Sequence, residues 1–139
     1  MQIEAKRGIG GLFYTPTLLS SPFLDEIASI NFAIDTGATM TTISDFDALN
    51  NNIICTHFEP TARTIGAGTS LATRKIRDCK IAFLSSIHSR IEKLNHVDVL
   101  CSFDSKPEVF TSTSVIGLDL LLNYRIYWKD NIAMILERT

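Results

Sequence analysis

A largely apolar run that ends abruptly in a carboxylate is the feature that most constrains this chain. Residues 30–34 read Ile-Asn-Phe-Ala-Ile, and Asp35, Thr36, Gly37 and Ala38 follow directly. Such a run is typical of a buried strand, and the small residues after it predict a tight turn that another backbone can approach closely. A carboxylate at the end of a buried strand loses hydration, so it needs a hydrogen-bonding partner or a chemical role.

The rest of the sequence favours strands. Residues 11–19, 27–34, 71–84 and 97–103 are each expected to form a strand, and the first of these segments is rich in β-branched and aromatic residues. The first two predict a hairpin, and residues 125–136 predict a second hairpin around an Asp-Asn turn. In the strand at 71–84, simple alternation would place Cys79 and Arg77 on the same face.

Two short helices are expected among these strands. Ser44 precedes the first and can cap it through the amide three residues later. The second is expected at about 118–124, with Asp119 as its N-cap. Many short strands with so few helices predict an all-β fold that closes into a barrel.

Composition predicts one globular domain. The 139 residues are 45% hydrophobic and 20% charged, so we expect a single domain over 1–139 with its core at about 11–137. A net charge of −2 and the lack of a long apolar run predict that neither nucleic acid nor a membrane is a partner. Three cysteines without metal-binding spacing predict free thiols. With no segment resembling a signal peptide, we expect a cytoplasmic protein.

An Asp-Thr-Gly triplet alone is a weak signal, since chance produces it in roughly a few per cent of chains this long. Two further elements strengthen it. Val115-Ile116-Gly117 lies about eighty residues downstream and again joins an apolar pair to a glycine. Between the two lies Ile65-Gly66-Ala67-Gly68, a glycine-rich hairpin tip about thirty residues after the aspartate.

Together these three elements resemble the retropepsin-like aspartic proteases. Asp35-Thr36-Gly37-Ala38 matches the family's D-T/S-G-A signature, and 115–117 match the element that precedes its C-terminal helix. The glycine-rich tip lies where the family carries its flap, here at about 62–72. The resemblance implies the closed β-barrel-like retropepsin fold with one or two short helices.

The resemblance also implies an activity, an aspartic endopeptidase that hydrolyses peptide bonds with a water molecule activated between two carboxylates. Two carboxylates so close together share one proton, which favours activity at acidic to mildly acidic pH. The sequence contains a single Asp-Thr-Gly. The resemblance therefore implies a homodimer that contributes Asp35 from each chain and binds an extended peptide or unfolded protein, with no cofactor and no metal.

The family pattern assigns roles to particular residues. Thr36 would support the turn, and the Gly37 carbonyl would accept from the substrate backbone. The residues implied are, as catalytic residues, Asp35, Thr36 and Gly37, and, as substrate-binding residues, Ala38, Thr39, Ile65, Gly66, Ala67, Gly68 and Ile116. Many retroviral members carry an Arg–acid pair where this chain has Leu118 and Thr39. Both partners are missing together, and we expect the C-terminal hairpin to contribute to the dimer.

Other interpretations remain open. Gly66-Ala67-Gly68 also resembles a phosphate-binding loop, but it lacks the ending of a P-loop. Cys55, His57, His88 and His96 lack the spacing of a zinc site. A second hypothesis is a catalytically silent retropepsin-like dimer that binds peptides or acts as a scaffold, because a fold does not prove a function. The intact Asp35 signature argues against it.

Overall fold

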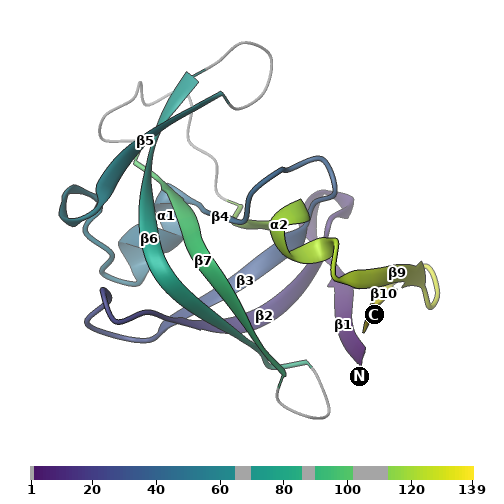
Figure 1. Cartoon of the computed structure of the whole chain (residues 1–139). Coiled ribbons are helices and arrows are strands. Elements are labelled where there is room, and N and C mark those ends of the chain that lie inside the picture. The colour runs from purple at the N-terminus through teal and green to yellow at the C-terminus, as the bar shows by residue number, and fades with distance from the viewer. Residues whose placement is uncertain (1, 65–69, 86–89, 102–112) are drawn as a thin grey trace.

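A computed structural model describes residues 2–64, 70–85, 90–101 and 113–139 of the chain (Figure 1). Its strands are β1 (Gln2–Arg7), β2 (Phe13–Ser20), β3 (Ala28–Ile34), β4 (Thr42–Ile43), β5 (Glu59–Thr64), β6 (Ser70–Phe83), β7 (Arg90–Leu100), β8 (Val115–Ile116), β9 (Tyr124–Trp128) and β10 (Ala133–Arg138). The helices are α1 (Asp45–Asn50) and α2 (Leu118–Leu121), with 3-10 turns at Ile9–Gly11 and Cys55–His57.

The strands close into a barrel. They follow the order β5-β6-β7-β4-β8-β3-β2-β1-β10-β9, and an additional pairing of β6 with β2 joins six consecutive strands of that order into a ring. The ring runs β6-β7-β4-β8-β3-β2. This arrangement confirms the predicted all-β, barrel-like fold with short helices.

Both predicted hairpins are present. Strands β2 and β3 pair antiparallel from Tyr14 with Ala33 to Leu19 with Ala28. Strand β9 pairs with β10 over its full length, and the Asp130 carboxylate accepts from the backbone N–H groups of Ile132 and Ala133 at 2.8 and 2.9 Å. An aspartate that binds amides two and three residues ahead is a common turn device.

The N-terminal segment corrects the prediction that the core begins near residue 11. Strand β1 pairs antiparallel with β10 along 2–6, and at its end with β2. The side chains of Ile3 and Ala5 are fully buried. As a consequence of this pairing, the two ends of the chain lie close together beside the C-terminal hairpin (Figure 1).

The long strand β6 is present as predicted, but its alternation is not. Asp78 has a φ of 53°, in the left-handed region. Ile76 and Cys79 are both buried although they lie three positions apart. The break at Asp78 lets β6 bend, so its first part pairs with β5 and its last part with β2. The predicted shared face of Arg77 and Cys79 is therefore wrong.

The interior holds one cluster of apolar side chains drawn from both the barrel and the β1–β10–β9 strands. All three cysteines are free thiols, with Cys55 half-buried and Cys79 and Cys101 buried. Burial raises the pKa of the Cys79 thiol to about 12. Neither of the described α-helices has the length and apolar character that a bilayer-spanning helix requires.

These thiol environments predict an order of chemical labelling. Because the thiolate is the reactive form, a thiol with a pKa of about 12 is almost entirely protonated at pH 8. We expect iodoacetamide to modify Cys55 first in the native protein, and Cys79 only after unfolding. Mass spectrometry of timed digests measures this order, and rapid native labelling of Cys79 would contradict it.

Candidate active site

The turn after β3 presents Asp35 at the protein surface. Its backbone N–H donates to the Ile116 carbonyl at 3.1 Å, and its carbonyl accepts from Ala38 N–H at 3.2 Å. The side-chain Oδ1 accepts from Gly37 N–H at 2.9 Å. Thr36 and Gly37 are exposed and Asp35 is half-buried. An ionised carboxylate can accept about four hydrogen bonds, so Asp35 retains capacity for a ligand.

The loop after Asp35 is docked on the N-terminal end of α2. Leu118 N–H donates to the Ala38 carbonyl at 2.8 Å, and Asp119 N–H donates to the Thr39 carbonyl at 3.1 Å. Gly117 permits this approach, since a Cβ there would lie 2.7 Å from the Met40 carbonyl carbon. Its φ of −101° is open to any residue. Space, rather than backbone conformation, therefore requires glycine here.

Asp119 holds the same loop through its side chain, which corrects its predicted role as N-cap. Gly117 occupies the N-cap position and Asp119 lies in the first turn. Asp119 Oδ1 accepts from both Thr41 N–H and Thr41 Oγ1, at 2.9 and 2.8 Å. Thr41 Oγ1 in turn accepts from Gly117 N–H at 3.2 Å. These bonds join the loop after Asp35 to the start of α2 through side chains as well as backbone.

A second polar cluster, which the sequence analysis missed, supports the strands beneath the turn. Ala33 N–H donates to the Ser114 carbonyl at 2.9 Å. Ser114 Oγ donates to Asp47 Oδ2 at 2.5 Å and accepts from Ser44 N–H at 2.9 Å. Ser44 also caps α1 as predicted, since its Oγ accepts from Asp47 N–H. Ser44 and Ser114 are far apart in sequence and both are fully buried, so no local pattern reveals the contact.

The other expected site residues fall into three groups. Ala38 and Thr39 lie in the docked loop, half-buried and exposed respectively. Ile116 is fully buried, so its side chain supports the turn from the core rather than lining the surface. The expected flap residues Ile65, Gly66, Ala67 and Gly68 lie outside the described residues. The strands on either side of them, β5 and β6, pair as an antiparallel hairpin.

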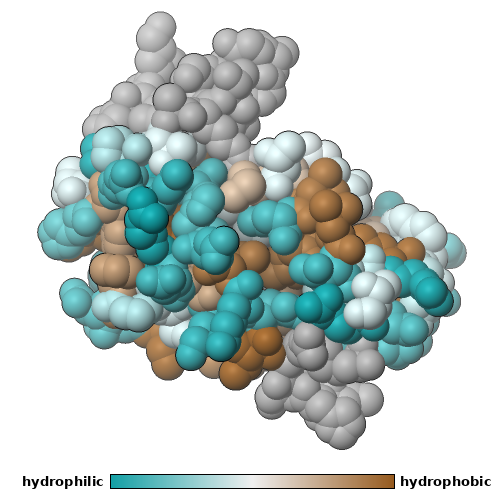
Figure 2. Space-filling view, viewed as in Figure 1, coloured by the Kyte–Doolittle hydropathy of each residue, from teal (hydrophilic) through white to brown (hydrophobic). Residues whose placement is uncertain are grey.

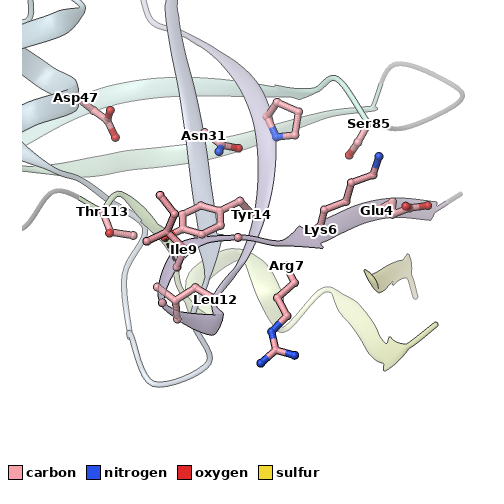
Figure 3. A pocket seen from close by; sticks show the side chains of 13 residues that line it. Glu4, Lys6, Arg7, Ile9, Leu12, Tyr14, Asn31, Asp47, Ser85 and Thr113 are labelled. Atoms are coloured by element: carbon pink, nitrogen blue, oxygen red, sulfur yellow. Dashed lines mark hydrogen bonds between the residues drawn. The ribbon is translucent and has the colours of Figure 1, made fainter. Parts of the chain in front are cut away.

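A groove of about 800 Å³ lies elsewhere, on the outer side of β1, β2 and β3. Glu4, Lys6, Tyr14, Asn31 and Asp47 are among the residues that line it (Figure 3), and Asp35 is not. Within the described part of the chain, no group of three or more His, Cys, Asp or Glu side chains is arranged to hold a metal ion. The chemistry available at the turn is that of the Asp35 carboxylate and nearby backbone groups.

The Gly117 contact predicts a strong effect from a single methyl group. We expect Gly117→Ala to lower the free energy of unfolding by about 1–3 kcal/mol, because the new Cβ overlaps backbone that cannot move independently. Urea denaturation followed by circular dichroism measures the change. A variant as stable as the wild type would show that the loop does not pack against α2 as described.

The Asp119 contacts predict a graded series. Asp119→Ala leaves two Thr41 donors without their acceptor in a buried setting, at a cost of about 1–3 kcal/mol. Asp119→Asn keeps the Oδ1 acceptor and should retain most of the stability. Equal losses in the two variants, measured by the same denaturation experiment, would mean that the charge matters rather than the Oδ1 hydrogen bonds.

Comparison with known proteins addresses the fold. No protein-family model matches the sequence, and no curated protein matches it. The structure is similar to that of a retropepsin-like aspartic protease from Rickettsia conorii, with a TM-score of 0.61 and 20% sequence identity over 98% of this chain and 89% of that chain. The chain therefore has the fold of the retropepsin-like aspartic proteases.

Proposed function

We propose that this protein is an aspartic endopeptidase that works as a homodimer and uses Asp35 from each chain. The observation that carries the proposal is the setting of Asp35. Its carboxylate lies in an exposed turn of small residues, within a loop fixed to α2 by backbone and side-chain hydrogen bonds. A structural aspartate in a surface turn has no need of such rigid support, whereas a catalytic group must be held in position.

One chain supplies half of the chemistry. Peptide hydrolysis by this mechanism needs one ionised and one protonated carboxyl group beside the same water molecule. The ionised carboxylate takes a proton from the water molecule while the oxygen of that water attacks the carbonyl carbon of the peptide. The protonated group donates to the carbonyl oxygen, where negative charge develops. Since the sequence has one Asp-Thr-Gly, the second carboxyl group comes from Asp35 of a second copy.

The proposed substrate is an extended peptide or an unfolded protein. The exposed Gly37 backbone next to Asp35 can offer its carbonyl to a bound strand, as sheet edges do in peptide recognition. Ala38 and Thr39 adjoin this position in the same loop. The tip between β5 and β6, with Ile65, Gly66, Ala67 and Gly68, is proposed to close over the peptide.

The decisive variant is Asp35→Asn, which removes the ionisable group and keeps the shape of the side chain. We expect it to reduce cleavage of a denatured protein by at least about 100-fold while the dimer persists in size exclusion. Wild-type cleavage should be strongest at acidic to mildly acidic pH, because the pair must retain one proton. Digestion across about pH 3 to 7, followed by gel electrophoresis, measures both.

Asp25→Asn is the matched control, since Asp25 is exposed in the turn between β2 and β3. It makes the same chemical change away from the proposed site and should leave cleavage unchanged. Cleavage that survives Asp35→Asn would rule out the proposed chemistry. A wild-type dimer that cuts nothing at any pH would instead favour the alternative, a catalytically silent dimer that binds peptides or acts as a scaffold.

A further inference from the structure

Strand β9 ends the sheet with a free edge. It is the last strand in the order, and among the described residues it pairs with β10 alone. Exposed apolar and aromatic side chains lie on it or close by, including Leu122, Tyr127 and Trp128. Hydrophobic surface (brown in Figure 2) is visible around α2, the helix that leads into β9. Free edges of this kind pair readily with another strand.

The C-terminal hairpin is also held rigidly against the barrel. Buried Glu92 of β7 accepts from Tyr124 Oη at 2.5 Å, and Arg138 Nε lies 3.1 Å from the same Glu92 oxygen. The Arg138 guanidinium lies over the Tyr124 ring, 5.6 Å from its centroid. At the other end of β9, Trp128 packs edge-on against Phe13. A preorganised edge loses little conformational freedom when it binds.

We propose that β9 pairs antiparallel with β9 of a second copy, with Ile126 of one chain opposite Ile126 of the other. This proposal rests on the homodimer proposed above and names the surface that forms it. The result is one continuous sheet in which β1, β10 and β9 of each copy meet at a twofold axis.

The strand that pairs with β9 belongs to a second copy of this chain, for two reasons. One chain supplies only one of the two carboxyl groups that the proposed site needs, and the geometry of the fold allows a symmetric pair. The twofold axis of an antiparallel strand pair is perpendicular to the sheet, so both copies keep the same face on the same side. The loop that carries Asp35 is hydrogen-bonded to α2, and β9 begins three residues after α2 ends. Pairing of β9 therefore places both α2 helices, with their docked loops, on one side of the joint sheet.

The sequence of β9, Tyr-Arg-Ile-Tyr-Trp, fits this register. With Ile126 at the centre, Tyr124 lies opposite Trp128 of the second copy. Arg125 lies opposite Tyr127 of the second copy, which suits a cation beside an aromatic ring. Centring the pair on Arg125 instead would set two like charges directly opposite each other, which is destabilising.

Charged substitutions at Tyr127 provide a test of this register. The charge that is favourable next to Glu137 within the chain is unfavourable next to Arg125 of the second copy. Within a chain, Tyr127 Oη donates to Glu137 Oε2 at 3.3 Å, so lysine suits this position and glutamate does not. Across the pair, Tyr127→Lys faces Arg125 of the second copy twice by symmetry, whereas Tyr127→Glu attracts it. We expect Tyr127→Lys to raise the dimer dissociation constant about tenfold and Tyr127→Glu to leave it unchanged or lower it.

Sedimentation equilibrium measures the dissociation constants, and circular dichroism verifies that each variant is folded. Ile132→Lys is the control, because Ile132 is 67% exposed and lies outside β9. It adds the same charge near the hairpin and should leave the dissociation constant unchanged. Equal effects of lysine and glutamate at 127, or weakening by Ile132→Lys alone, would overturn the proposed pairing.

A cross-linking experiment tests the register directly. In a Cys55→Ser background, which removes the half-buried native thiol, Ile126→Cys should form a disulfide-linked dimer under mild oxidation. Arg125→Cys should not, since its two copies are offset along the strands. Absence of the Ile126→Cys dimer, when the wild type is dimeric, would overturn β9 pairing.

The two proposals fail in different ways. The cross-link and the dissociation constants do not depend on cleavage, and both can be measured in the Asp35→Asn variant. A dimer that cuts peptides but lacks the β9 cross-link refutes only the surface. A β9 cross-linked dimer that cuts nothing refutes only the proposed activity. A chain that stays monomeric at every concentration refutes both.

Discussion

The contact between Gly117 and the loop that follows Asp35 is the constraint on which the rest of the site depends. The loop reaches α2 because no side chain stands between the Met40 backbone and Gly117. Once that distance is closed, the amides at the start of α2 meet the Ala38 and Thr39 carbonyls, and Asp119 meets Thr41. Exposed loop residues would otherwise sample many conformations. The loop after Asp35 is held by Ile116 at its start and by α2 further along, so the Asp35 carboxylate that it carries has a defined orientation.

What the sequence could predict was local. The turn after 30–34 and the Ser44 cap depend on residues within a few positions of one another, and the β2–β3 hairpin joins strands that are consecutive in the sequence. The structure contains all three. The Val115-Ile116-Gly117 element was also visible in the sequence, as an apolar pair followed by a glycine. These features follow from propensity and turn chemistry, which nearby residues largely decide.

What the sequence could not predict depends on residues that meet across the fold. Strand β1 has too few apolar residues to stand out, and it is a strand because β10 pairs with it. Aspartate is a typical N-cap residue, but the Asp119 carboxylate instead accepts a hydrogen bond from Thr41, which is distant in sequence and close in space. Alternation in β6 fails because Asp78 adopts a left-handed conformation where the strand changes partners. In each case a long-range contact outweighed a local preference.

The pairing of β1 with β10 also bears on when, during folding, the sheet that carries β9 is completed. Gln2 is opposite Glu137, so strands at the two ends of the domain must find each other before this part of the sheet forms. Contacts between such distant positions form late in folding, because closing the intervening chain costs entropy. The edge of β9 is anchored through β10 to this same sheet, so it is complete only after β10 has paired with β1. The dimer proposed above, which forms through that edge, therefore requires two chains in which the first and last strands of the sheet have already paired.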